Sequence, residues 1–277
     1  MKALLYPAVV LAALTGGVEP AQAQDEAASV ARRLVVRSGL AVQLRSVPKG
    51  FEQQITQLRG QIPDAIYASL QRAGKEAFRP EGLQAEIERS LPEKLKVAEM
   101  QKALAWLETQ AGRRVTLAEE AASSTLDEAS LKKYAEQSKG KPISTRRKQL
   151  LQDLIAATAA IDSTANLIEA TSLGVAIGMD STQPVQKRAG VAALRAQIQK
   201  AMPRDELKKA LAASLPGIYA YTYREVGEAD LAAYLAFLRG ADGKRYNDAM
   251  VEAFSQALVA ASVRMGQLVD QTEKRPT

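Results

Sequence analysis

Apolar residues recur at the spacing of an α-helix wherever this chain shows a clear hydrophobic pattern. Two stretches place apolar residues at positions i, i+3, i+4 and i+7: Met100, Ala103, Leu104 and Leu107, and then Leu231, Tyr234, Leu235 and Leu238. The alternation of apolar and polar residues that marks a half-buried strand is missing. Glycine and proline divide the sequence into segments of ordinary helix length. The sequence therefore predicts an all-α fold, a helical bundle of about ten helices.

A short polar run divides the chain almost evenly. Residues 138–142 contain two lysines, a glycine and a proline, a composition typical of a linker. We assign 24–137 to an N-terminal helical half, 138–145 to the linker, and 146–277 to a C-terminal helical half.

The two halves carry related segments. Residues 103–107 (Ala-Leu-Ala-Trp-Leu) align with residues 234–238 (Tyr-Leu-Ala-Phe-Leu), and a glycine followed by a basic pair comes after each. This repeat predicts two similar helical hairpins, 97–125 and 228–256. The residues of each elbow are Trp106 and Gly112 in the first hairpin, and Phe237 and Gly243 in the second. We expect both aromatic side chains to be largely buried and each glycine to close a turn in a left-handed conformation.

A pair of basic residues follows each elbow glycine. The pairs are Arg113 and Arg114 in the first copy and Lys244 and Arg245 in the second. If a helix begins just after the glycine, each cation costs about 0.3–1 kcal/mol at the positive end of the helix dipole. Three explanations remain open: the first helix runs further, acids such as Glu108 and Asp242 pair with the cations, or the cations contact an anion.

The chain contains no histidine and no cysteine. The commonest general base, the commonest zinc ligand and the thiolate nucleophile are therefore all absent. Two Ser-x-x-Lys matches, Ser46 to Lys49 and Ser130 to Lys133, lack the partner motifs of penicillin-binding enzymes. The sequence gives no reason to expect a metal or a cofactor, and it marks no catalytic residue.

Carboxylates and tyrosines are the remaining chemical groups. Glu119 and Glu120 are adjacent, and neighbours on a helix do not face each other, so we interpret them as part of a solvated helix face. Five of the eight tyrosines lie between 219 and 246. Core packing is the favoured interpretation of these tyrosines, and an aromatic groove for a ligand is the alternative.

The N-terminus resembles an export signal. Lys2 precedes an uncharged segment, 3–14, and Ala21-Gln22-Ala23 forms a small-x-small cleavage site. We expect residues 1–23 to be a signal peptide cleaved near Ala23, and the protein to be periplasmic or secreted. The most apolar later segment, 167–179, is too short to span a bilayer. The formal net charge of +6 favours anionic surfaces, and export argues against a nucleic-acid partner.

Two segments resemble a known family. Residues 237–246 (Phe-Leu-Arg-Gly-Ala-Asp-Gly-Lys-Arg-Tyr) are similar to the signature of a bacterial family known as domain of unknown function 2059, an aromatic followed by glycine and a basic pair. Residues 33–39 resemble the opening helix of that family. This chain has Gly240-Ala241 where the family often has Ser-Pro. The resemblance implies an exported, helical protein and supplies no activity and no catalytic residue.

The sequence does not decide between two functions. The favoured one is a non-enzymatic envelope protein that binds a partner, which we expect to be an anionic envelope component or another envelope protein. The alternative is a carboxylate-dependent hydrolase or lytic enzyme acting on an envelope polymer. A buried, unpaired glutamate in a deep cleft would favour the enzyme, and a closed core with shallow grooves would favour the binding protein.

Overall fold

The computed structural model describes residues 19–56, 59–140, 143–181 and 183–273. Within these ranges the fold is all-α, as predicted, with fourteen α-helices, two short 3-10 helices and no strand. The backbones at Arg59 and Ile62 form one isolated bridge. Residues 1–18 of the predicted signal peptide lie outside the described ranges. Its cleavage near Ala23 stays a prediction.

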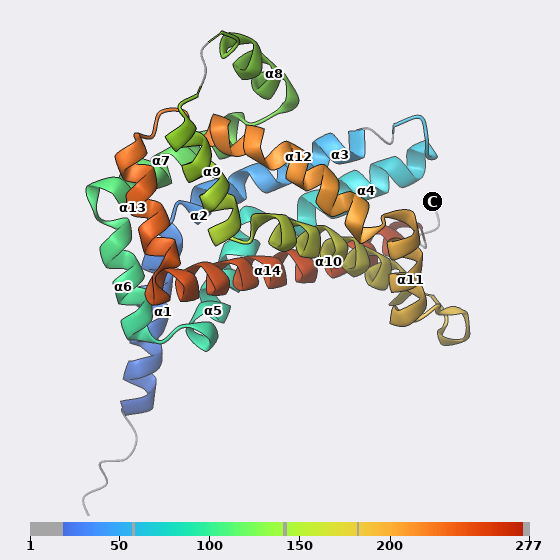
Figure 1. Cartoon of the computed structure of the whole chain (residues 1–277). Helices are drawn as coiled ribbons and strands as arrows, with labels where there is room; N and C mark the ends of the chain where they lie inside the picture. The colour runs from blue at the N-terminus through green and yellow to red at the C-terminus, as the bar shows by residue number, and fades with distance from the viewer. Residues whose placement is uncertain (1–18, 57–58, 141–142, 182, 274–277) are drawn as a thin grey trace, which may run out of the picture.

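The predicted linker, 138–145, runs from the end of α8 to the first residue of α9, and its residues 141–142 lie outside the described ranges. The first nine elements are α1 (Glu19–Arg37), α2 (Leu40–Gln43), η1 (Leu44–Ser46), α3 (Val47–Thr56), α4 (Asp64–Ala77), α5 (Pro80–Lys94), α6 (Val97–Leu107), α7 (Gln110–Thr125) and α8 (Glu128–Gln137). The others are α9 (Thr145–Ala157), α10 (Ala160–Ser181), η2 (Val185–Lys187), α11 (Val191–Ala201), α12 (Arg204–Thr222), α13 (Glu228–Arg239) and α14 (Ala241–Glu273). Helix α8 projects from one end of the bundle (Figure 1), and its Tyr134 packs edge-on against Tyr221 of α12.

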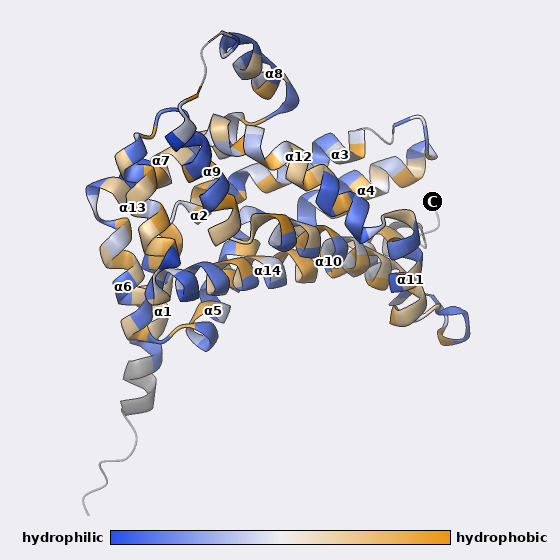
Figure 2. Cartoon of the chain, viewed as in Figure 1, coloured by the Kyte–Doolittle hydropathy of each residue, from blue (hydrophilic) through white to orange (hydrophobic). Residues whose placement is uncertain are grey.

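The long helix α14 joins the two halves. It packs against α4, α5 and α6 of the N-terminal half and against α10 and α13 of its own half. One buried cluster therefore combines side chains from 30–107 with side chains from 246–269. A second cluster gathers side chains from 115, 150–154 and 220–238. Most helices are striped with hydrophobic and hydrophilic residues, so each places one face in these clusters (Figure 2).

Glycines bring α10 and α14 into close contact, and the two helices run side by side across the molecule (Figure 1). A Cβ atom added at Gly178 would lie 2.2 Å from the carbonyl oxygen of Val263, and one added at Gly266 would lie 2.3 Å from that of Val175. The apolar segment 167–179 thus packs on another helix. None of the helices in the described part of the chain combines the length and apolar character that a membrane crossing requires.

The two predicted hairpins are present, as α6–α7 and α13–α14. Their helices begin at equivalent positions, since 97 and 110 become 228 and 241 at an offset of 131 residues. The elbow glycines make the same contact: a Cβ atom would lie 2.3 Å from the carbonyl oxygen of Trp106 at Gly112, and 2.0 Å from that of Phe237 at Gly243. The expected left-handed conformation was wrong, because neither glycine has a positive φ angle. Both lie inside the second helix, where they let two backbones approach.

Trp106 and Phe237 stack on each other between the hairpins. Their ring centroids are 4.3 Å apart and their planes differ by 7°. Both rings are half-buried, not largely buried as expected. Each ring packs one face on the other and borders both buried clusters, which leaves part of the stack at the surface.

Candidate functional site

Two of the four predicted anion-contact residues bond within their own hairpin. Arg113 donates from Nε to the carbonyl oxygen of Glu108 at 2.9 Å. Lys244 forms an ion pair with Asp248, with 2.8 Å between Nζ and Oδ2. Both cations lie on the exposed surface, where a single ion pair contributes about 0–1 kcal/mol.

The other two bond across the junction between the hairpins. Arg114 donates from Nε and NH2 to the two carboxylate oxygens of Asp230, at 2.7 and 3.0 Å. Arg245 lies 2.9 Å from Glu99, between Nε and Oε1. Arg114 and Arg245 are equivalent in the repeat, and so are Glu99 and Asp230. The contacts are therefore reciprocal, as in a two-fold arrangement.

The acids named from the sequence have other partners. Glu108 lies 3.8 Å from both Arg33 and Arg37, and Asp242 pairs with Lys102 at 3.0 Å. All four elbow cations thus have acceptors within the described part of the chain. Two of them, Arg114 and Arg245, bridge the hairpin junction, and contact of any of the four with an anion stays a prediction.

Glu119 is the most unusual ionisable group in the described residues. It lies on the inner side of α7, between the buried residues Val115 and Ala122. The hydroxyl of Tyr223 donates to its Oε1 at 2.6 Å, and Tyr234 also donates to its carboxyl group. No lysine or arginine of the described chain forms an ion pair with it. Glu119 was interpreted as part of a solvated helix face; it is instead half-buried, because the C-terminal half covers part of it.

Burial raises the pKa of Glu119 to about 7. The two tyrosine hydrogen bonds favour the charged form and oppose this rise, whereas the charge of Glu120 adds to it. Burial and the nearby Glu119 charge raise the pKa of Tyr223 and of Tyr234 well above its usual range. Both phenols therefore remain hydrogen-bond donors, and Glu119 exchanges its proton near neutral pH.

Four of the five C-terminal tyrosines gather around this carboxyl group. Tyr219 packs edge-on against Tyr223 with ring centroids 5.7 Å apart, and Tyr246 is buried nearby. Tyr221 points elsewhere, and its hydroxyl donates to Thr125 at 2.9 Å. The tyrosines pack in the core, which was the interpretation favoured from the sequence. They also surround the carboxyl group of Glu119, a polar centre that the sequence did not reveal.

Arg147 fixes the turn that carries Tyr223. Its guanidinium donates to the carbonyl oxygen of Tyr223 and, at 2.8 Å, to that of Val226. This turn connects α12 to α13, so one cation on α9 anchors the segment between two tyrosine-bearing helices. Arg147 thereby positions the donor of the 2.6 Å hydrogen bond to Glu119.

A cavity of about 240 Å³ opens beside Glu119. Its walls come from Ser38, which follows α1, and from α2, α7, α13 and α14. The lining residues are Ser38, Leu40, Gln43, Glu119, Tyr234, Tyr246, Asn247, Met250, Val251 and Phe254. Glu119 is the one carboxylate among them. The described residues contain no cluster of acidic side chains that could hold a metal ion. The cavity therefore offers a single proton-exchanging group with aromatic and apolar walls.

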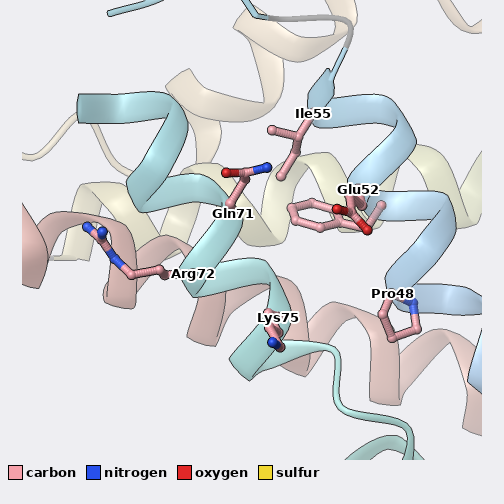
Figure 3. A pocket seen from close by; sticks show the side chains of 7 residues that line it. Pro48, Glu52, Ile55, Gln71, Arg72 and Lys75 are labelled. Carbon is pink, nitrogen blue, oxygen red and sulfur yellow. The ribbon is translucent and has the colours of Figure 1, made fainter. Parts of the chain in front are cut away.

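A larger hollow of about 390 Å³ lies between α3 and α4. Ile55 and Gln71 point toward each other across it (Figure 3). Its charged residues, Glu52, Arg72 and Lys75, are all exposed to solvent. Because water screens such charges, they would attract a charged ligand only weakly.

Comparison with known proteins found no matching family model, no matching curated protein and no matching solved structure. The similarity to domain of unknown function 2059 therefore stays a resemblance carried by short segments.

Sequence reasoning missed Glu119, although one signal was present. Val115, Glu119 and Ala122 fall at i, i+4 and i+7, so the carboxylate interrupts an apolar stripe of α7. A charged residue at such a position is rarely left without partners, and it marks a candidate site.

Proposed function

We propose that this chain is a non-enzymatic binding protein of the bacterial envelope, and that the cavity at Glu119 holds the ammonium group of a small organic cation. The observation that carries the proposal is the carboxyl group of the half-buried Glu119, which two phenols hold without a cationic partner at the wall of a cavity. The N-terminal sequence and the resemblance to an exported family support the location in the envelope.

An ammonium ion fits the chemistry of this cavity. The charged form of Glu119 lacks a counter-ion in the described chain, and a ligand cation would supply one. Tyr234, Tyr246 and Phe254 line the same space, and aromatic faces attract cations by about 0.5–2 kcal/mol. Binding would stabilise the charged carboxylate and release its proton, so affinity depends on pH.

Isothermal titration with n-butylammonium as the probe tests the proposal. Because the pKa of Glu119 is about 7, we expect the affinity to rise about tenfold per pH unit below pH 7 and to level off above it. Glu119→Gln should lose both the binding and its pH dependence. Glu120→Gln removes an adjacent charge outside the cavity lining and should retain both.

Two further controls complete this design. Neutral 1-butanol should bind far more weakly than n-butylammonium, since it cannot pair with a carboxylate. Equal affinity of the parent and Glu119→Gln for n-butylammonium would sink the proposal. Incubation of both proteins with native envelope extract, followed by mass spectrometry of what remains bound, then identifies the natural ligand.

The enzymatic alternative has one specific observation in its favour. A carboxyl group with a pKa of about 7 suits general acid catalysis near neutral pH. Glycoside hydrolysis normally uses two carboxylates about 5–10 Å apart, and Glu119 is alone in the lining of its cavity. Such an enzyme would have to use one residue as both acid and base. Release of soluble fragments from peptidoglycan by the mature protein, but not by Glu119→Gln, would establish this alternative.

A further inference from the structure

The segment that joins α10 to α12 carries positive charge without any acid. Residues 181–204 include five basic residues and no aspartate or glutamate. Of these five, Arg204 pairs with Asp162 and Glu169. The other four form no ion pair with a described residue: Lys187, Arg188, Arg195 and Lys200. This part of the chain therefore presents an excess of positive charge.

The same segment projects from the molecule. Every residue from 183 to 193 is exposed, and α11 contains no buried residue. Helix α11 packs on α10, and only Leu194 and Ile198 of its residues are half-buried. In Figure 1, α11 lies at the end of the molecule opposite to α6 and α13. Residues 183–193 therefore form a convex surface that a neighbouring body can reach.

Exposed apolar side chains are concentrated at this surface. Six large hydrophobic side chains of the described chain are exposed, and three of these six lie between 179 and 191: Met179, Val185 and Val191. Val185 is 70% exposed, more than any other of the six. Single exposed apolar residues are ordinary, but a group of them beside cations is typical of an interaction surface.

Hydrogen bonds fix the loop that presents Val185. Asp180 accepts from the backbone N–H groups of residues 189 and 190, at 2.8 and 3.2 Å. Arg188 donates to two backbone carbonyl oxygens at the start of the loop, at 3.0 and 2.7 Å. The loop is therefore held in shape before any contact, so docking does not have to order it.

We infer that η2 and the first turn of α11 dock on an anionic phospholipid bilayer. Val185 and Val191 enter the region between the headgroups, and Lys187 and Arg195 contact the lipid phosphates. Each cation at an anionic bilayer raises the affinity about fivefold. Each valine side chain that leaves water adds to this affinity. The weak contacts of one rigid tip thus add up on an extended charged surface, which a single small anion does not offer.

A bilayer suits this surface better than an acidic protein does. A protein partner would need a hollow shaped to the convex loop, whereas mobile lipid headgroups move apart around apolar side chains. The surface is also separate from the cavity at Glu119, none of whose lining residues lies between 179 and 204. The inference is therefore independent of the function proposed for that cavity.

A fluorescent label at the tip tests the inference. The chain has no cysteine, so Val185→Cys provides one site for a fluorophore whose emission shifts to the blue in apolar surroundings. We expect this shift with vesicles of phosphatidylglycerol and phosphatidylcholine in equal parts, and not with phosphatidylcholine alone. The same label at Ala129→Cys, an exposed position of α8, should not shift with either vesicle. Because the shift is local, binding through another segment of the chain does not produce it.

Charge variants of the protein labelled at Val185→Cys test the electrostatic part. Lys187→Gln together with Arg195→Gln should raise the lipid concentration that gives half of the shift about twenty-five-fold. Lys132→Gln together with Lys133→Gln removes the same charge from exposed positions of α8. This control should change that concentration less than about twofold, because charges further than about 10 Å from the bilayer are screened.

Three results would overturn the inference. The label at Val185→Cys does not shift on anionic vesicles, neutral vesicles shift it equally, or the two double variants behave alike. A shift of the same size with soluble poly-L-glutamate would identify an acidic polypeptide as the partner, and it would also overturn the inference.

Discussion

The indole of Trp106 lies face to face with the ring of Phe237, and the two residues occupy the same place in two copies of one helical hairpin. The stack also borders both buried clusters. It is therefore the point at which the N-terminal and C-terminal hairpins meet, with the reciprocal ion pairs of Arg114 and Arg245 nearby in sequence.

Replacing either stacked ring should destabilise the fold, and the two losses should not add. Trp106→Ala and Phe237→Ala should each cost less than the about 3–5 kcal/mol of a fully buried aromatic, because both rings are half-buried. A double-mutant cycle measured by urea unfolding should give a coupling of about 0.5–1.5 kcal/mol. Full additivity would show that the rings do not stabilise each other.

The elbow glycines should tolerate no side chain. Gly112→Ala and Gly243→Ala should each lower the free energy of unfolding by about 1–3 kcal/mol, because the new Cβ atom meets a carbonyl oxygen at 2.3 or 2.0 Å. Gly82→Ala is the control, since nothing lies within 4 Å of its Cβ position in α5. It should be neutral or stabilise by up to about 1 kcal/mol. Thermal unfolding of the three variants distinguishes close packing from a general intolerance of alanine.

The two ion pairs across the junction should behave alike. Double-mutant cycles with Arg114→Gln and Asp230→Asn, and with Arg245→Gln and Glu99→Gln, should each give a coupling of about 0.2–1 kcal/mol. Both couplings should fall as salt rises, because the pairs are partly exposed. If only one pair shows coupling, the reciprocal contacts do not stabilise the junction equally.

Glu119 should make the protein less stable as pH rises. Its pKa is about 7 in the folded chain against 4.5 as the ordinary value, so between these values the folded state holds a proton that the unfolded state has lost. The contribution of Glu119 to the free energy of unfolding is therefore greatest below about pH 4.5. It falls by an amount on the order of 3 kcal/mol as the pH rises toward 7.

Glu119→Gln should remove this dependence, because glutamine still accepts a hydrogen bond from Tyr223 and carries no charge. At pH 8 its midpoint of thermal unfolding should exceed that of the parent by roughly 2–4 °C for each 1 kcal/mol gained. Glu120→Gln should keep the slope between pH 5 and pH 7. A parent protein whose midpoint is flat over that range would contradict the perturbed pKa of Glu119.

Helices and hairpins could be predicted from the sequence because they depend on local periodicity and on a repeat that conserves spacing. The reason for glycine at position 112 could not be predicted. A side chain there would collide with the carbonyl oxygen of Trp106, and that contact is visible only in the folded structure. Glu119 escaped prediction for a similar reason. Its burial depends on Tyr223 and Tyr234, which are more than a hundred positions away in sequence.

The packing of α14 against the N-terminal half also could not be predicted from the sequence. The predicted second hairpin ended at 256, whereas α14 continues to Glu273. Those extra turns carry it across α4, where the hydroxyl of Ser69 donates to the carbonyl oxygen of Val269 at 3.1 Å. The sequence of a long helix such as α14 does not reveal which other helices pack against it.

The offset that relates the hairpins also relates Glu119 to Met250, and both residues line the same cavity. A dimer of identical halves would carry the same side chain at both places: two acids that repel each other, or two thioethers with no charge. Carrying both copies on one chain lets each position vary independently. In this chain one of the two equivalent positions is an acid and the other a polarisable thioether, so the cavity lining has a polarity that a symmetric pair of subunits could not produce.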